Sequence, residues 1–155
     1  MSEALESLDL DPGFIAACVS PHAMRAWWRE VHPGVFAAQV LTAASCQALN
    51  DAITSYEANA MGEDAPTNTR HRRGLLASAL GLDHALDALV SAWLAPVAQA
   101  LFQAYIVGRI AEQHSYFVRY GAGYDVDLGF HVDDAEVTLN LCLPHSGEGS
   151  QLHFE

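Results

Sequence analysis

The sequence changes character near residue 113, and this change limits the folds open to the chain. Upstream, apolar residues recur at spacings close to a helical period, and Pro and Gly residues interrupt this spacing where helices end. Downstream, aromatic and β-branched residues form short runs separated by glycines, which is typical of strands and turns. We therefore expect one domain over residues 1–155 with an α+β fold, helical in 1–112 and β-structured in 113–155.

Several residues indicate where the upstream elements begin and end. Thr42 suits the N-cap of a helix, and Pro96 suits a helix's first turn. Pro33 and Gly34 disfavour continuation of a helix that begins at Pro21. The expected upstream elements are helices over 21–30, 43–58, 83–94 and 96–102, a strand over 36–41, and an exposed loop over 61–74 that carries the basic run 70–73.

The charge composition restricts the partners that the chain can have. It contains 7 Arg and no Lys against 19 acidic residues, which gives a formal charge of −12. Such a surface repels phosphate groups, so nucleic acid and anionic membranes are not expected partners. The most apolar stretch, from Leu86 to Ile110, is interrupted by polar residues and Pro96, so we expect no membrane span.

The cysteines and the first residues favour a cytoplasmic location. Cys18, Cys46 and Cys142 are odd in number, far apart and set among apolar neighbours. This pattern is typical of buried thiols in a reducing compartment, and not of a disulfide framework. The segment Met1 to Glu6 is acidic and lacks the cationic and apolar parts of a secretory signal.

One residue separates His131 from Asp133 within the strand-like half. Residues two apart in a strand project to the same side, so the pair can offer an imidazole and a carboxylate to one point. This is part of a 2-His-1-carboxylate iron site. The alternative is a surface His beside a turn Asp, but the following polar Thr138 and Asn140, in an otherwise apolar run, favour metal binding. The expected strands lie over 115–120, 128–133, 136–143 and from 151 onward, with a turn over 121–124 and a loop over 144–150.

The segment from Ser115 to Leu143 resembles the first half of the catalytic core in 2-oxoglutarate and Fe(II)-dependent dioxygenases of the prolyl and lysyl hydroxylase group. The likeness is strongest over 131–140, which reads His-Val-Asp-Asp-Ala-Glu-Val-Thr-Leu-Asn and has Ala135 where a related branch has Ser. The segment 147–154 is similar to that branch's Gly-Gly-x-Leu-x-Phe strand, with Ser150 in a glycine position.

The resemblance implies both a fold and a site. The fold would be helices packed outside a double-stranded β-helix of the jelly-roll type, of which this chain carries the N-terminal part. His131 and Asp133 would bind Fe(II), while Tyr120 and Asn140 would line the 2-oxoglutarate pocket, and ascorbate is a further candidate cofactor. No catalytic residue is expected beyond the metal ligands. The second iron-binding His and the Arg that holds 2-oxoglutarate would lie on strands beyond Phe154.

The activity implied by this resemblance is hydroxylation of an unactivated C–H bond, with a peptidyl Pro or Lys side chain as the leading substrate. Without the distal His and Arg, the alternative is a non-catalytic remnant or interaction module, and open strand edges could lead to self-association. A third hypothesis is a zinc hydrolase that uses His131, Asp133 and another His. His145 and His153, the next imidazoles along the chain, are expected at the surface.

Overall fold

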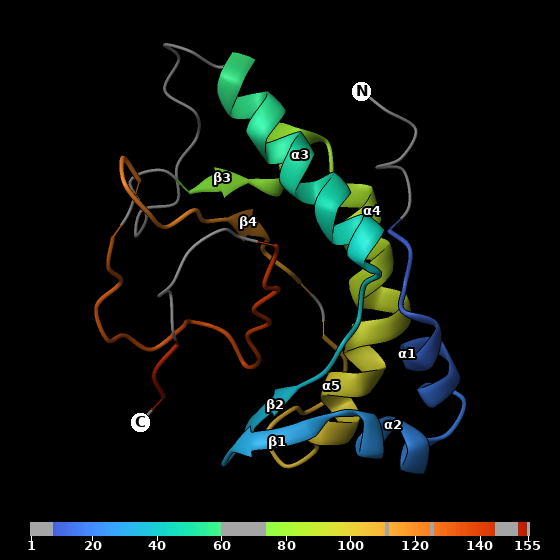
Figure 1. Cartoon of the computed structure of the whole chain (residues 1–155). Coiled ribbons are helices and arrows are strands. Elements are labelled where there is room, and N and C mark those ends of the chain that lie inside the picture. Colours follow the sequence, from blue (N-terminus) through green and yellow to red (C-terminus); the bar gives the residue numbers. More distant parts are fainter. Residues whose placement is uncertain (1–7, 60–73, 111, 125, 145–151, 155) are drawn as a thin grey trace.

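The computed structural model describes residues 8–59, 74–110, 112–124, 126–144 and 152–154. The helices gather on one side of the molecule, and the described residues after 117 loop on the other side and form no helix (Figure 1). The described residues also form two small antiparallel sheets, one joining β1 (Arg29–His32) to β2 (Val35–Ala37) and one joining β3 (Leu75–Leu76) to β4 (Tyr116–Phe117). No helix in these ranges is both long and apolar enough to cross a membrane.

Two short helices open the described part of the chain, and each starts with a polar cap followed by proline. Asp11 caps α1 (Pro12–Ala17) by accepting hydrogen bonds from two backbone N–H groups, at 2.8 and 3.3 Å. Ser20 caps α2 (Pro21–Trp27) in the same way, at 3.2 Å. The missing N–H of proline costs nothing at these first helical positions. Helix α1 was not expected from the sequence.

The two helices pack closely because Gly13 has no side chain. A Cβ atom at Gly13 would lie 2.4 Å from Cη2 of Trp27, well inside van der Waals contact. The indole of Trp27 in turn donates to the backbone carbonyl of Gln39 at 2.8 Å, which ties α2 to the segment that leads into the next helix.

A β-hairpin follows α2, so the prediction that a helix extends to residue 30 is wrong at its end. The helix stops at Trp27 because Arg29–His32 pairs with Val35–Ala37 instead. Gly34 takes a φ of +74°, which favours glycine in the turn, and its N–H donates to the Glu30 side chain at 3.0 Å. The second strand is shorter than the predicted strand over 36–41.

The long helices agree well with the predicted ones. Helix α3 (Ala43–Asn59) begins where expected, and the Thr42 hydroxyl accepts from the N–H of Ser45 at 3.2 Å, which confirms the N-cap. Helices α4 (Asp83–Leu89) and α5 (Ala95–Leu101) are joined by a π-helical stretch, Val90–Leu94, into one continuous run. The π-helical stretch accommodates Pro96, which supplies no N–H to the helix and would crowd the preceding turn.

The hydrophobic core lies between these helices. Fully buried side chains come from α1, from the residue before the Thr42 cap, from α3 and from the N-cap position of α4, and they are Phe14, Leu41, Leu49 and Leu82. Leu75, Ala77 and Leu80, in β3 and the 3₁₀-helix η2 (Ala77–Leu80), close the core on the side that faces β4. Further along, Leu141 and Leu143 pack against the same core, so it anchors the non-helical half as well.

Two expected strands in the downstream half do not form, so these predictions are wrong for the described residues. The segments 128–133 and 136–143 contain no strand, and of the strand expected over 115–120 only Tyr116–Phe117 forms. A strand requires a ladder of hydrogen bonds to a neighbour, and no described segment supplies one to either stretch. The expected loop over 61–74 lies outside the described residues except at Gly74, and the expected loop over 144–150 does so except at Pro144.

The three thiols differ in exposure, and the expectation that all three are buried is wrong for Cys142. Cys46 is buried, Cys18 is partly buried and Cys142 is exposed. Leu141 and Leu143 on either side pack inward, and an extended chain alternates its side chains, so Cys142 points outward. Burial raises the pKa of the Cys18 thiol, and it raises the pKa of Cys46, with a further contribution from Cys142.

Shortening a fully buried side chain of α3 should destabilise the whole fold. Leu49→Ala is expected to lower the free energy of unfolding by about 2–5 kcal/mol, because the removed atoms leave a cavity in the core. Leu152→Ala removes the same atoms from a side chain that is 61% exposed and is the control. Chemical denaturation measures both, and equal losses would contradict the assignment of the core.

The thiols should react in two phases with a thiol-specific reagent at mildly alkaline pH. Cys142 is expected to react first, because it is exposed, whereas burial keeps Cys18 and Cys46 protonated and shielded. Cys142→Ser should remove the fast phase and leave the slow one. A fast phase that persists in Cys142→Ser would contradict this order of accessibility.

Candidate metal centre

The candidate site lies in the non-helical segment after β4. This segment begins at the sheet with β3, passes the glycines of the 121–123 turn, and returns to the core at Leu141. The backbone bends at 134–136, directly after the His-x-Asp pair. Both ends of the segment are therefore held by the helical half, and the pair lies between these two attachments.

His131 and Asp133 lie with their side chains together. Nε2 of the imidazole is 3.1 Å from Oδ1 of the carboxylate, and about a third of each side chain is exposed. Residues two apart in an extended chain project to one side, so this contact is the geometry that the sequence spacing predicts. The structure thus brings together the two residues singled out as metal ligands.

The hydrogen bond of Nδ1 determines whether a proton or a metal ion can lie between Nε2 of His131 and Oδ1 of Asp133. Nδ1 of His131 is 2.9 Å from the carbonyl oxygen of Gly129, an atom that can only accept a hydrogen bond. Nδ1 therefore carries the proton in that contact, and Nε2 of a neutral ring presents a lone pair to the Asp133 oxygen. Two acceptors that face each other repel, so a second proton or a metal ion between Nε2 and Oδ1 would stabilise this contact.

Thr138 orients the carboxylate. Its hydroxyl donates to Oδ2 of Asp133 at 2.7 Å, which leaves Oδ1 directed at His131. The sequence marked Thr138 only as a polar interruption of an apolar run, and its role as a support for Asp133 was missed. Gly129 was missed as well. It contacts His131 through its backbone carbonyl, and every residue has such a carbonyl, so the sequence gives no signal of this role.

The spacing of the two ligand atoms fits a metal ion. Two ligands at about 2.1 Å from a first-row divalent metal and at right angles to each other lie about 3.0 Å apart. The observed separation of 3.1 Å needs little adjustment. Metal-binding imidazoles commonly donate their other N–H to a backbone carbonyl, as His131 does to Gly129. The donor set therefore fits a divalent metal.

Negative charge surrounds the pair. Asp133, Asp134, Ala135 and Glu136 line a hollow of about 290 Å³ beside it. A concave surface with several carboxylates raises the local concentration of cations. Within the described ranges, however, no group of three or more His, Cys, Asp and Glu side chains is placed to hold a metal.

The remaining residues singled out in the sequence are at the surface. Tyr120 is 37% exposed, and Asn140 is exposed. Their placement beside a bound co-substrate stays a prediction. His153 is exposed, as expected, whereas His145 lies outside the described residues.

A polar cluster joins the start of this segment to helix α3. Arg119 forms an ion pair with Glu57 at 2.7 Å, and its other terminal nitrogen donates to the Thr54 hydroxyl at 3.0 Å. Its guanidinium lies 5.3 Å from the centroid of the Tyr124 ring, and the Tyr124 hydroxyl is 3.3 Å from Glu57. This cluster holds the chain on both sides of Tyr120 against α3. No sequence pattern predicts it, because its α3 residues lie more than 60 positions from Arg119 and Tyr124.

Comparison with curated proteins gives relatives over most of the chain. The 2-oxoglutarate and iron-dependent oxygenase domain-containing protein ICU11 of Arabidopsis thaliana is 34% identical to this chain over 128 residues. The protein of the same description named CP2, from the same plant, is 36% identical to this chain over 129 residues. The human 2-oxoglutarate and iron-dependent oxygenase domain-containing protein 2 is 32% identical over 162 aligned positions, which cover 98% of this chain.

The chain belongs to the family of 2-oxoglutarate and iron-dependent oxygenase domain-containing proteins.

The relatives are considerably longer than this chain. The alignments cover 32% of each Arabidopsis protein and 46% of the human one, so the chain spans from just under a third to just under a half of their length. No profile of a known protein family matches the chain. No solved structure matches it significantly either.

The Arg119 cluster can be tested by its energetic coupling. Because both side chains of the ion pair are only about 30% exposed, Glu57→Gln and Arg119→Met should show a coupling free energy near the upper end of the range for exposed pairs, about 1 kcal/mol. A double-mutant cycle of urea unfolding measures it. Strictly additive effects would contradict a direct attachment of this segment to α3.

Proposed function

We propose that this chain forms part of a 2-oxoglutarate- and Fe(II)-dependent oxygenase site, in which His131 and Asp133 are two of the iron ligands. The observation that supports the proposal most strongly is the pair of acceptors, Nε2 and Oδ1, that face each other at 3.1 Å while Nδ1 is engaged by Gly129. The names of the relatives indicate the metal and the co-substrate. Bound iron with 2-oxoglutarate would supply the oxidising chemistry for C–H hydroxylation.

The residues of this chain would do the positioning. Gly129 holds the imidazole in the tautomer that leaves Nε2 free to bind, and Thr138 fixes the rotation of the Asp133 carboxylate. Such supports of metal ligands commonly contribute tenfold or more to metal affinity. The neighbouring carboxylates of Asp134 and Glu136 would attract the cation without needing to bind it directly.

The finer parts of the proposal rest on the resemblance. Tyr120 and Asn140 would line the 2-oxoglutarate pocket, and a peptidyl Pro or Lys side chain is the proposed substrate. Arg119 and Tyr124, on either side of Tyr120, are bound to α3, which holds the backbone at this position. Ascorbate as a cofactor and a cytoplasmic location also stay predictions.

We propose in addition that the non-helical segment is the beginning of a jelly-roll sheet. Val126, Leu128, Phe130 and Val132 occupy alternate positions, opposite the row that carries His131 and Asp133. Phe130 is 75% exposed and Val132 88% exposed, and apolar rows of this kind are normally covered by another layer. Strands that correspond to the part of the relatives outside the alignment would cover this row, and a second copy of the chain is the alternative that self-association would indicate.

Metal binding tests the proposal on this chain directly. Titration with Mn(II), a stand-in for Fe(II) that can be followed by electron paramagnetic resonance, should show one site whose affinity falls more than tenfold in His131→Ala and in Asp133→Ala. Thr138→Val should weaken the site less, because it removes only the support of the carboxylate. His22→Ala alters an exposed imidazole on α2 and should leave the affinity unchanged.

A measurement of 2-oxoglutarate turnover then distinguishes an oxygenase from a non-catalytic interaction module. With Fe(II) and O₂, a protein that contains this segment within the length of its relatives should convert 2-oxoglutarate to succinate, and His131→Ala should abolish the conversion. Metal binding without any turnover would instead favour the non-catalytic interaction module. Tight binding of Zn(II) with hydrolytic activity would contradict the oxygenase assignment.

A further inference from the structure

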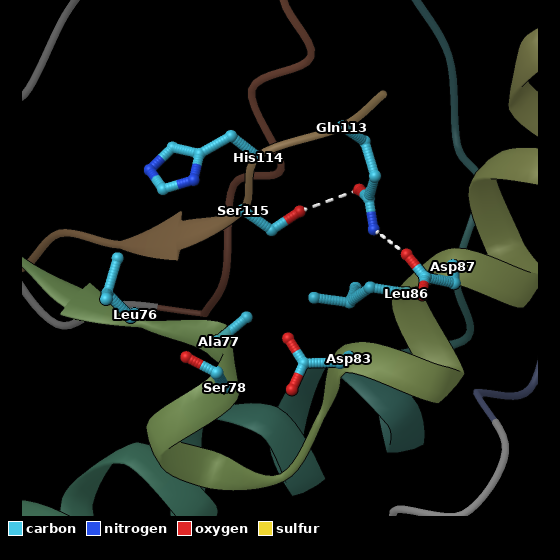
Figure 2. Close-up of a pocket in the computed structure, with 9 residues that line it drawn as sticks. All are labelled: Leu76, Ala77, Ser78, Asp83, Leu86, Asp87, Gln113, His114 and Ser115. Atoms are coloured by element: carbon cyan, nitrogen blue, oxygen red, sulfur yellow. Dashed lines mark hydrogen bonds between the residues drawn. The ribbon is translucent and has the colours of Figure 1, made fainter. Parts of the chain in front are cut away.

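A second cavity lies beside the β3–β4 sheet, where β3 and η2, helix α4 and the segment 113–115 meet. It has a volume of about 360 Å³, and its lining residues are Leu76, Ala77, Ser78, Asp83, Leu86, Asp87, Gln113, His114 and Ser115 (Figure 2). This volume lies at the lower end of the range of small-ligand pockets. None of the nine residues belongs to the proposed metal centre.

The walls of the cavity are held together by backbone and side-chain hydrogen bonds. The N–H of Ala77 donates to the carbonyl of Ser115 at 3.1 Å, beside the paired strands β3 and β4. The Ser115 hydroxyl donates to the Gln113 side chain at 2.9 Å, and the Gln113 amide donates to Asp87. The segment 113–115 is thereby fixed to both η2 and α4, so the cavity is preformed.

The cavity combines an apolar floor with acidic walls. Ala77 and Leu86 are buried and provide the floor, while Asp83 and Asp87 are exposed and carry the negative charge. Figure 2 shows the carboxyl group of Asp83 directed into the space between Ser78 and Leu86. Within the described residues Asp83 has no hydrogen-bond or ion-pair partner, and no Arg lines the cavity.

The two carboxylates repel each other unless a cation lies near them. Asp83 and Asp87 are four residues apart on α4, a spacing at which like charges destabilise a helix. Gln113 offers Asp87 a neutral amide donor, which does not balance the charge. Carboxylates beside an apolar floor suit an organic cation, whose N–H groups can donate to the carboxylate oxygens while its carbon chain covers the floor.

We propose that this cavity binds a basic side chain, arginine or lysine, of a protein partner. Its alkyl stem would lie on Ala77 and Leu86, and its charged end would bind Asp83 and the free oxygen of Asp87. Long basic side chains combine these two properties, since their stems are apolar and their ends are strong donors. This proposal does not depend on metal binding at His131 and Asp133.

Blocked amino acids provide the test on the whole chain. N-acetyl-arginine methylamide and N-acetyl-lysine methylamide should bind weakly and shift the NMR signals of the Gln113 side-chain amide and the Leu86 methyl groups. N-acetyl-norleucine methylamide has a similar stem without charge and should bind roughly tenfold more weakly, which corresponds to one lost charge-assisted hydrogen bond. Added salt should weaken only the two charged probes.

A matched pair of variants identifies the site. Asp83→Asn should weaken both charged probes roughly tenfold. Asp51→Asn makes the same change of charge on α3, where Asp51 accepts from Gln47, and should leave binding unchanged. Because both positions are exposed, thermal unfolding should show that both variants remain folded.

Several results would overturn the proposal. Norleucine amide that binds as well as the charged probes would show a merely apolar site, and equal losses in Asp83→Asn and Asp51→Asn would show a general effect of charge. No change at Gln113 and Leu86 under saturating probe would show that the cavity is not used. Spermidine that binds more tightly than both amides would assign the cavity to free polyamines and overturn the assignment to a protein side chain.

Discussion

The alternation of side chains along an extended backbone governs the non-helical half of this protein. Residues two apart lie on one side of such a chain, and neighbours lie on opposite sides. His131 and Asp133 meet for this reason, at 3.1 Å. The same rule turns Cys142 outward between two leucines that pack on the core, and it leaves Phe130 and Val132 exposed on the side opposite the pair.

The helical half gives this segment its fixed points. One attachment is polar, where Arg119 and Tyr124 bind Glu57 on α3, and the other is apolar, where Leu141 and Leu143 join the core. Between these attachments, Gly129 and Thr138 support the pair locally. The site is therefore assembled by neighbours in sequence and positioned by residues far from it in sequence.

The sequence predicted best those features that depend on local signals. Helix α3 and its Thr42 cap were recognisable because one side chain and a helical period define them. The convergence of His131 and Asp133 was recognisable because residues two apart in an extended chain project to the same side. The strands over 128–133 and 136–143 were not correctly predicted, because strand formation depends on a partner that propensity does not reveal. The Arg119 cluster and the cavity beside α4 arise from tertiary packing, and no motif in the sequence indicates them.

Metal binding by His131 requires a proton on Nδ1, so that Nε2 can offer its lone pair to the ion. Long-range ¹H–¹⁵N NMR of the imidazole at about pH 8, where an ordinary imidazole is neutral, distinguishes the two tautomers. We expect a proton on Nδ1 and a large shift of the Nε2 resonance when Zn(II), a diamagnetic substitute for Fe(II), is added. A proton on Nε2 that Zn(II) fails to displace would contradict the proposed metal site.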